Sequence, residues 1–518
     1  MNTTDFLSIA TSICPDRVAI IFEVNRNTFS QLGERVDRLA SALSALGVKK
    51  GDRVAMLQVN CNQFVEAYFA AAKLGAIYVP LNFRVKGDEL TYMLNSSESG
   101  TLLIGERYID LVNSLRTNLS SVRHFISIES RRDGMLAYEE MIASSPADEV
   151  ITEIDDDDTT ILMYTAGTTG QPKGVMLSHN SFAVYVLENV TPADPELEER
   201  NILTVPLYHV AGIQAMMAAI YGGRTLIMER QFEAKEWMEL AESEKANRAM
   251  MVPTMLKQLM DHPEFGEHDL SSLKVITYGA APMPFEVIKK ALDVFPGISF
   301  INAFGQTETA STITTLGPED HVISGTEEER EKKLRRLSSI GRPMSDVEMK
   351  IVGEDGQELP VGQVGEIVAR GPRVMTGYWK DEEKTKKTID KDGWVHTGDM
   401  GYMDEDGYFY LAGRATDMII RGGENISPEE VEAVLLTHPK VDEAAVIGVP
   451  DEEWGEQPKV IVVLKQGEPA TAGEIMEYCR ERLASFKRPR SVVFVDELPR
   501  NQMGKVLKRV LREQYGKV

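Results

Sequence analysis

The stretch YTAGTTGQPKG, from Tyr164 to Gly174, combines three glycines, three threonines and one lysine between two apolar segments. Glycine lets backbone N–H groups approach a phosphate because no Cβ stands in the way. Threonine hydroxyls can donate hydrogen bonds to phosphate oxygens, and the lysine adds a mobile positive charge. The stretch therefore predicts a turn that grips phosphate, although a flexible surface loop has a similar composition. The phosphate-binding residues would be Thr165, Ala166, Gly167, Thr168, Thr169, Gly170 and Lys173.

This phosphate loop, residues 164–174, is not the loop of the P-loop NTPases. That loop requires the pattern G-x-x-x-x-G-K-[ST]. Counting from Gly167, Pro172 stands where the second glycine belongs, and Gly174 stands where the hydroxyl belongs. The partners of the loop must therefore be sought elsewhere in the chain.

A second motif, NAFGQTE, follows the apolar segment Ile298 to Ile301. It would lie at the carboxyl end of a strand, where α/β sheets usually bind ligands. Phe304 offers an aromatic face for a purine, Thr307 a hydroxyl for a phosphate, and Glu308 a carboxylate ligand for Mg²⁺. The nucleotide-binding residues of this motif would be Asn302, Ala303, Phe304, Gly305, Gln306 and Thr307.

Four further motifs follow the same line of argument. The small residues of YGAAPMP, which begins at Tyr278, would let a flat ring lie close. In WVHTGD, Asp399 can accept two hydrogen bonds from a vicinal diol such as that of ribose. In GRATD the cation is Arg414, and in LPRNQMGKVLKR a lysine occurs at Lys505. If Asp399, Arg414 or Lys505 occurred alone, each would be interpreted as an ordinary charged residue of the surface.

Taken together and in this order, the motifs resemble those of the AMP-forming acyl-CoA synthetases, the superfamily of acid–CoA ligases, luciferases and nonribosomal adenylation domains. The resemblance extends over almost the whole chain and implies ATP, Mg²⁺, CoA and a small carboxylic acid as reactants. It assigns catalysis to Lys505, Thr165 and Glu308, with Glu308 as the Mg²⁺ ligand. Phe304 is a departure, because the family usually carries tyrosine there. The resemblance implies nucleotide contacts by Gly279, Ala280, Ala281, Pro282, Asp399 and Arg414, in addition to those given above.

The C-terminal segment is similar to the family domain that rotates between adenylation and thiol attack. The pivot falls at Thr416, where family members commonly have Asp or Lys, and Asp417 is the neighbouring candidate. Some benzoate-type CoA ligases bind the CoA nucleotide with an aromatic ring and two cations at positions matching those in FKRPR. The resemblance implies CoA contacts by Arg421, Gly422, Gly423, Glu424, Phe486, Arg488 and Arg490.

The segment PLYHVAG resembles the family's stretch at the acyl pocket. His209 would orient the carboxylate or move as a gate, and a packed structural histidine is the alternative. Small residues in this region and in the nucleotide motifs leave room for an aromatic, alicyclic or medium-chain acid. The pocket would comprise His209, Val210, Gly212, Gly279 and Ala303.

These observations favour an ATP-dependent acid–CoA ligase. A stand-alone adenylating enzyme that loads a carrier protein would keep every ATP motif. A luciferase-like oxygenase and a noncatalytic nucleotide-binding module are further alternatives.

The periodicity of apolar residues predicts an α/β fold. One amphipathic helix runs from about Leu32 to Leu46, with Ser30 as a candidate N-cap and Gly47 as its end. The charged segment EEEREKKLRR, residues 327–336, is typical of an exposed helix. Strands are expected at residues 53–57, 77–81, 102–104, 125–128, 202–205, 225–228, 275–278, 298–301, 347–352, 365–369, 408–412, 444–449, 460–464 and 492–495.

The predicted architecture has two parts. A large N-terminal domain, 1–415, would contain two α/β subdomains with largely parallel sheets and a β-rich subdomain at about 339–413. A small mobile α+β domain would occupy 416–518.

Composition limits the partners. The chain of 518 residues carries 80 acidic and 56 basic side chains, a net charge of −24, which disfavours nucleic acids and anionic membranes. Its three cysteines have no metal-ligand spacing. The N-terminus has no signal-peptide pattern, and no apolar run reaches the roughly 18 residues of a membrane helix. We therefore expect a cytoplasmic protein without a transmembrane segment, and the resemblance allows a homodimer.

Overall fold

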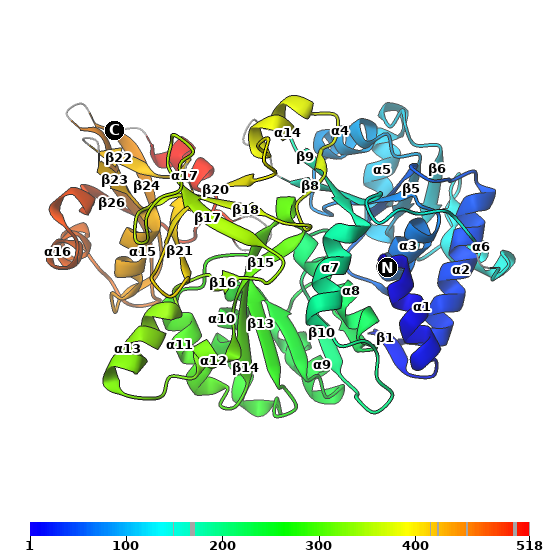
Figure 1. Cartoon of the computed structure of the whole chain (residues 1–518), viewed down its shortest axis with the longest axis horizontal. Coiled ribbons are helices and arrows are strands. Elements are labelled where there is room, and N and C mark those ends of the chain that lie inside the picture. Colours follow the sequence, from blue (N-terminus) through cyan, green and yellow to red (C-terminus); the bar gives the residue numbers. More distant parts are fainter. Residues whose placement is uncertain are drawn as a thin grey trace.

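The computed structural model describes residues 1–148, 150–165, 171–414, 416–421, 424–451, 454–500 and 505–516, and for residues 424 and 425 it describes the backbone alone. The strands of this part of the chain form four sheets, and helices pack against them (Figure 1). None of the described helices combines the length and the apolar character that crossing a bilayer requires.

An eight-stranded sheet carries the phosphate loop. Its strand order is β19-β9-β8-β4-β3-β5-β6-β7, and the strands from β8 to β7 in this order are parallel. At the other edge β8, β9 and β19 pair antiparallel, so the phosphate loop connects the two strands of a hairpin. The strands are β3 (Arg53–Leu57), β4 (Ile77–Pro80), β5 (Thr101–Ile104), β6 (His124–Ser127), β7 (Leu136–Ala137), β8 (Thr159–Thr165), β9 (Lys173–Ser178) and β19 (Gly377–Tyr378).

A nine-stranded sheet carries the second and third nucleotide motifs. Its order is β16-β15-β14-β13-β12-β10-β11-β1-β2, with parallel strands from β14 to β1 and antiparallel strands at both edges. The strands are β1 (Val18–Phe22), β2 (Asn25–Thr28), β10 (Arg200–Leu203), β11 (Thr225–Met228), β12 (Arg248–Met251), β13 (Val275–Gly279), β14 (Ser299–Gln306), β15 (Ser311–Leu316) and β16 (Arg342–Pro343).

Helices join these two sheets through a shared core. Buried side chains of α2, α3, α7 and α8 pack in one cluster with strands of both sheets, for example Phe64 of α3 with Ile20 of β1 and Ile161 of β8. Each such buried side chain contributes about 1.5–3 kcal/mol. The helices of this large part are α1 (Thr4–Ile13), α2 (Phe29–Ala45), α3 (Asn62–Lys73), α4 (Gly87–Ser97), α5 (Ile109–Leu115), α6 (Tyr138–Ser144), α7 (His179–Asn189), α8 (Val210–Tyr221), α9 (Ala234–Ser243), α10 (Pro253–Asp261), α11 (Phe285–Val294), α12 (Pro318–His321), α13 (Glu327–Arg336) and α14 (Glu382–Thr388).

The start of α2 corrects one expectation. Thr28, not Ser30, is its N-cap: the Thr28 hydroxyl accepts from the Gln31 backbone N–H, and the Gln31 side chain accepts from the Thr28 N–H. This reciprocal pair satisfies two backbone donors of the first turn. Ser30 therefore lies inside the helix.

Two smaller sheets complete the described chain. The four-stranded antiparallel sheet has the order β17-β18-β20-β21, and the five-stranded sheet has the order β23-β22-β25-β24 with β26 beside β25. Their strands are β17 (Glu348–Val352), β18 (Gly365–Arg370), β20 (Val395–Met403), β21 (Phe409–Arg414), β22 (Ile419–Arg421), β23 (Glu424–Ile426), β24 (Val441–Asp451), β25 (Gly455–Leu464) and β26 (Ser491–Phe494).

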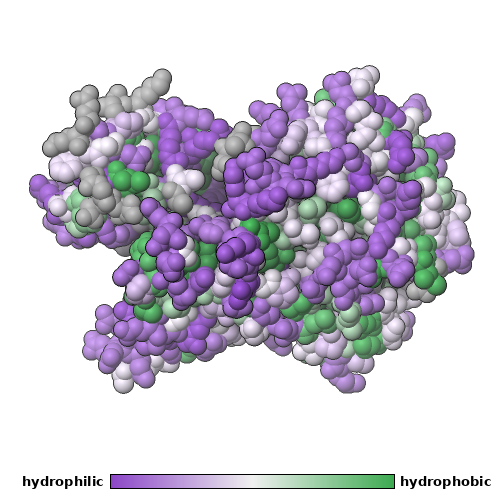
Figure 2. All heavy atoms as spheres, turned by 45° about the horizontal axis from the view of Figure 1, so that its top comes forward, coloured by the Kyte–Doolittle hydropathy of each residue, from purple (hydrophilic) through white to green (hydrophobic). Residues whose placement is uncertain are grey.

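Helices α15 (Pro428–Leu436), α16 (Ala472–Arg482) and α17 (Lys508–Tyr515) pack on the five-stranded sheet, whose buried clusters are separate from those of the large part. In Figure 2 a notch separates this C-terminal part from the large part, on a face covered mainly by hydrophilic residues. The predicted fold class is confirmed, with several sheets in a large α/β part and a small α+β part at the C-terminus. The limits 1–415 and 416–518 stay a prediction.

Candidate active site

The phosphate hairpin brings Lys173 to Glu308 of the second motif. Thr165 ends β8 and pairs in register with Lys173 at the start of β9, whereas Ala166 to Gly170 lie outside the described residues. The Lys173 ammonium is 5.2 Å from the centre of the Tyr378 ring, and the Tyr378 hydroxyl donates to Glu308 Oε1 at 2.8 Å. Burial lowers the pKa of Lys173, and the Lys384 ammonium lowers it further. Glu308 opposes this shift because its negative charge lies close by.

Tyr378 is a site residue that the sequence did not indicate. It belongs to β19, a strand of two residues that is too short to show any periodicity. Its position is fixed by pairing with β9, which no local signal predicts. Burial and the Glu308 carboxylate both raise the pKa of Tyr378, so its hydroxyl stays protonated and continues to donate.

The two motifs of the nine-stranded sheet lie side by side on neighbouring strands. Gly279 at the end of β13 pairs with Ala303 in β14. A Cβ on Gly279 would lie 2.0 Å from the Ala303 carbonyl oxygen, so glycine permits this close approach of the two strands. Ala280, which precedes Ala281 and Pro282, has a positive φ of 64°. Non-glycine residues rarely adopt that conformation except where the surrounding structure imposes it, often at ligand sites.

A sharp reversal after β14 fixes Glu308. Ala310 and Ser311 have positive φ values of 47° and 84°. A Cβ on Gly305 would lie 1.4 Å from the Ser311 carbonyl oxygen, so only glycine fits there. Asn302 is buried and donates to the Ser339 carbonyl, while Phe304 packs partly against apolar residues near the four-stranded sheet. Gln306 donates its backbone N–H to Thr309, and Thr307 begins the single helical turn that carries Glu308.

Asp399 and Arg414 form an ion pair on adjacent strands. They are register partners in β20 and β21, and Arg414 Nε is 2.6 Å from Asp399 Oδ1. Arg414 also donates to the Thr397 carbonyl at 3.0 Å. Burial raises the pKa of Asp399, although the charges of Arg414 and Lys505 oppose this rise. The two residues predicted to bind the ribose and phosphate therefore lie together.

Lys505 belongs to the C-terminal part and lies within electrostatic range of this pair. Loss of contact with water beside the surrounding protein lowers the pKa of Lys505, and the positive charge of Arg414 lowers it further. Asp399, Asp417 and Glu429 act in the opposite direction. Lys505 is nevertheless exposed. The lysine is therefore close enough to interact electrostatically with Asp399 and Arg414, and its role in adenylation stays a prediction.

Three of the five predicted acyl residues, His209, Val210 and Gly212, lie at the start of α8, whereas Gly279 and Ala303 belong to β13 and β14. Burial lowers the pKa of His209 to about 3, so its imidazole is neutral. Its Nε2 atom is buried without a hydrogen-bond partner among the described residues. Val210 is buried, and a Cβ on Gly212 would lie 2.4 Å from the Pro206 carbonyl oxygen. Gly212, like Gly279, is therefore required for close packing of the backbone, in addition to any space that it leaves for a substrate.

Gln214 of α8 is a second residue that the sequence did not single out. Its Oε1 accepts from the Thr312 hydroxyl at 3.2 Å, and its buried Nε2 has no partner in the described part of the chain. Thr312 pairs with Gly305, so this amide lies next to the nucleotide strand β14. A glutamine inside an apolar helix carries no periodic signal of its own.

The predicted CoA residues are brought together only in part. Buried Arg421 donates to the Phe486 carbonyl at 2.9 Å, but the Phe486 ring packs partly against the C-terminal core. Arg488 donates to the Leu483 carbonyl at 2.9 Å, and Arg490 is exposed. Gly422 and Gly423 lie outside the described residues, as does the side chain of Glu424.

The hinge candidates differ in their contacts. Asp417 Oδ1 is 2.6 Å from Arg512 Nη2 of α17, which ties it to the C-terminal part. Thr416 forms no side-chain hydrogen bond among the described residues. The assignment of the pivot to Thr416 stays a prediction.

The phosphate hairpin, the Glu308 turn, the Asp399–Arg414 pair and the adjacent lysine together define an adenylate-forming enzyme. Two family models match the chain: "AMP-binding enzyme" at residues 10–379 and "AMP-binding enzyme C-terminal domain" at residues 430–505. The chain belongs to the AMP-binding enzyme family, and it is an AMP-forming acid–thiol ligase.

Three similar proteins illustrate the family. An indoleacetate–CoA ligase of Aromatoleum aromaticum is 33% identical, with 99% of this chain and 98% of that protein covered. The long-chain-fatty-acid–CoA ligase FadD13 of Mycobacterium tuberculosis is 36% identical, with coverages of 95% and 93%. The crystal structure of the anthranilate CoA ligase AuaEII in complex with anthranoyl-AMP superposes with a TM-score of 0.90 at 27% identity, with coverages of 100% and 97%.

Proposed function

We propose that this ligase activates a carboxylic acid with a largely apolar body, either aromatic, alicyclic or a hydrocarbon chain, and transfers its acyl group to CoA. One observation supports this reaction. Four charged side chains from separate segments of the chain lie close enough to interact with one another: Lys173, Glu308, Asp399 and Lys505. The acids named in the three similar proteins described above each carry one carboxylate on an aromatic ring system or a hydrocarbon chain. The neutral imidazole of His209 is compatible with such a body.

In the first half-reaction, a carboxylate oxygen of the acid attacks the α-phosphorus of ATP, and the bond to pyrophosphate breaks. Asp399 would accept hydrogen bonds from the ribose hydroxyls, while Lys173 and the threonines of the phosphate loop would hold the phosphates. Lys505 would neutralise the negative charge that develops between the carboxylate and the α-phosphate. Acyl-AMP and pyrophosphate are the products.

In the second half-reaction, the CoA thiolate attacks the acyl carbon, and AMP leaves. Arg421 and the segment that includes Phe486, Arg488 and Arg490 would receive CoA. Arg490 is the cation best placed for a phosphate of CoA because it is exposed and forms no ion pair among the described residues. The boundary at 415/416 is proposed because β21 ends at Arg414 and β22 begins at Ile419.

Glu308 fits the role of a Mg²⁺ ligand. Its Oε1 accepts from Tyr378, and its Oε2 has no partner among the described residues. No group of three or more His, Cys, Asp or Glu side chains that could hold a metal occurs in that part of the chain. A bound Mg²⁺ would therefore take most of its ligands from phosphates and water, and it would supply charge neutralisation.

The experiment is pyrophosphate release with Mg-ATP and a panel of benzoate, cyclohexanecarboxylate, indoleacetate, hexanoate, octanoate, decanoate and acetate, each with and without CoA. Multiple turnovers that require one acid class and CoA are the expected result, and reactions without acid are the control. Acid-dependent release of about one equivalent that does not continue with CoA would contradict the ligase and favour transfer to a carrier protein. A cytoplasmic location and a homodimer are also proposed; fractionation and sedimentation would test them.

A further inference from the structure

A second cavity lies at the opposite end of the strand that carries the nucleotide motif. It has a volume of about 690 Å³ and is bordered by α11, the turn before β14, α12 and α13. Ser299, at the start of β14, lines this cavity, whereas Gln306 ends the same strand at the nucleotide site. Seven steps along a strand correspond to about 23 Å. The cavity is therefore separate from the site described above.

The charged helix α13 forms one wall. Arg330, Leu334 and Leu337 line the cavity and follow the spacing of a single helix face. Other residues hold the helix in place: Lys332 forms an ion pair with Asp406, and Lys333 donates to the Val322 carbonyl at 2.8 Å. The sequence identified the segment 327–336 only as an exposed helix. In the structure one face of this helix lines the cavity.

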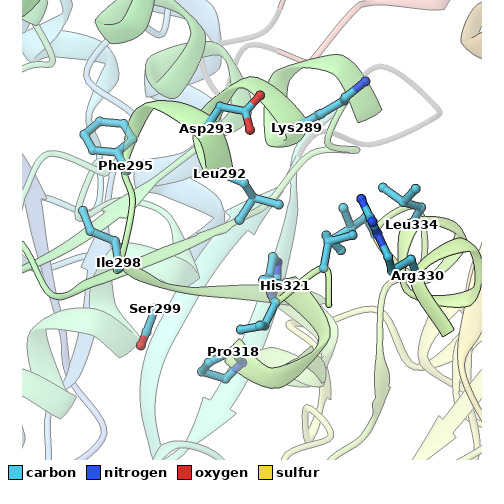
Figure 3. A pocket seen from close by; sticks show the side chains of 14 residues that line it. Lys289, Leu292, Asp293, Phe295, Ile298, Ser299, Pro318, His321, Arg330 and Leu334 are labelled. Carbon is cyan, nitrogen blue, oxygen red and sulfur yellow. The ribbon is translucent and has the colours of Figure 1, made fainter. Parts of the chain in front are cut away.

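The lining combines apolar and charged groups. Figure 3 shows Lys289 of α11 and Arg330 of α13 on one side of the cavity and Phe295 and Ile298 on the other. Lys289 and Arg330 are exposed, and neither forms an ion pair or a side-chain hydrogen bond among the described residues. The apolar part of the lining comprises Leu292, Phe295, Ile298, Ile323, Leu334 and Leu337.

The charges of the lining indicate which net charge a ligand of this cavity should have. Two cations against the single carboxylate of Asp293 leave one net positive charge, on a chain whose net charge is −24. His321 adds none, because burial lowers its pKa and both ring nitrogens are already bound, to Tyr278 at 2.9 Å and to the Gly317 carbonyl at 2.7 Å. One net positive charge suits a monoanion, whereas a nucleotide polyphosphate would lack compensation and meet Asp293.

We propose that this cavity binds an amphipathic monocarboxylate. The carboxylate lies near Lys289 and Arg330, and the hydrocarbon body extends toward Phe295 and Ile298 on the other side of the cavity. The volume falls in the range of about 300–1,000 Å³ that small-molecule sites occupy. Charge complementarity to two unpaired cations gives the site its preference for the anion over the corresponding alcohol.

The test is calorimetric titration of the full chain with decanoate, after the nucleotide site has been saturated with a non-hydrolysable decanoyl-adenylate analogue. We expect one decanoate to bind and decanol to bind at least about tenfold more weakly. Arg330→Gln should weaken decanoate binding about tenfold or more. The matched control is Arg335→Gln, which removes an exposed arginine of the same helix that does not line the cavity and should leave binding unchanged.

A variant that fills the cavity with a larger side chain tests the proposal without changing its charge. Leu334→Trp should abolish decanoate binding while the chain remains folded by circular dichroism, because Leu334 is only partly buried. No saturable binding to the wild-type chain, or equal affinity in the wild type, Arg330→Gln and Leu334→Trp, would overturn the proposal. Neither outcome depends on pyrophosphate release, so the proposed ligase reaction stands or fails separately.

Discussion

Lys505 is the residue whose removal should separate the two half-reactions. Its ammonium lies near Asp399 and Arg414, where the α-phosphate would be held. Lys505→Ala should slow acyl-AMP formation by about 10²- to 10³-fold, the typical cost of losing a group that stabilises transition-state charge. Thioester formation from supplied acyl-AMP should stay within about twofold. The measurement is single-turnover kinetics of each half-reaction, and equal loss in both would refute this division of roles.

The pH dependence of the first half-reaction follows from the same residue. Lys505 acts as a cation, and its pKa is lowered by the surrounding protein and by Arg414. The protonated form is therefore lost as pH rises, and the loss begins at a lower pH than for a lysine in water. We expect the rate of acyl-AMP formation to fall in the alkaline range below the ordinary lysine pKa of about 10.4.

Arginine offers a control for this assignment, because its guanidinium stays charged throughout that range. Lys505→Arg should lower the rate but remove the alkaline decline. An unchanged pH profile in Lys505→Arg would show that another group titrates.

Among elements, the contact between β13 and β14 gives a stability prediction. A Cβ at Gly279 would meet the Ala303 carbonyl oxygen at 2.0 Å, and that oxygen cannot retreat without disturbing the register of the two strands. Gly279→Ala should lower the free energy of unfolding by about 1–3 kcal/mol, as overpacking usually does, and raise KM for ATP. Urea unfolding and initial-rate kinetics measure the two effects.

Gly266→Ala is the matched control, because nothing lies within 4 Å of a Cβ at Gly266. It should change neither quantity appreciably. If Gly279→Ala raised KM for ATP but left the free energy of unfolding unchanged, the strand contact would not limit this position, and only a role in leaving room for the ligand would remain.

Local patterns predicted those strands and helices that carried a signal of their own. Every strand expected from the sequence overlaps a strand of the structure, and the strands Arg53–Leu57 and Thr225–Met228 and the helix Glu327–Arg336 have the predicted limits. These segments are continuous apolar runs or a clear charge pattern. The two-residue strands β16 and β19 were not predicted, since two residues show no period.

The site was predictable as a set of motifs and less so as a geometry. The motifs assigned Asp399, Arg414, Gly279 and Ala303 to one nucleotide site, and in the structure Asp399 pairs with Arg414 and Gly279 pairs with Ala303. The link between Lys173 and Glu308 through Tyr378 depends on the pairing of β9 with β19, two strands that are distant in the chain. Long-range pairing leaves no local trace in composition, so Tyr378 became visible only in the structure.

At the scale of the whole molecule, the position of the C-terminal part decides which half-reaction the site can perform. In this structure Lys505 lies close to Asp399, which is the arrangement proposed for acyl-AMP formation. Among the described residues, an ion pair outside the predicted site residues connects the two parts: Lys257 Nζ of α10 is 3.1 Å from Asp442 Oδ1 of β24. Both side chains are about a third exposed, with fractions of 37% and 36%.

Breaking the Lys257–Asp442 ion pair should destabilise the arrangement proposed for acyl-AMP formation and not the one required for thiol attack. An ion pair of such exposure contributes about 0.2–1 kcal/mol, which corresponds to a factor of at most about five in a conformational equilibrium. Asp442→Asn should therefore slow acyl-AMP formation by up to about fivefold and leave thioester formation from supplied acyl-AMP unchanged or faster. Lys257→Gln should add nothing further in the Asp442→Asn background, because the interaction is already lost.

Lys235→Gln is the control variant, since Lys235 pairs with Glu264 inside the large part and makes no contact with the C-terminal part among the described residues. It should leave both half-reactions unchanged. If Asp442→Asn slowed the two half-reactions equally, or if Lys235→Gln had the same effect, the pair would support general stability and not the arrangement of the two parts. A selective effect would instead mean that residues far from the nucleotide set the balance between adenylation and thiol transfer.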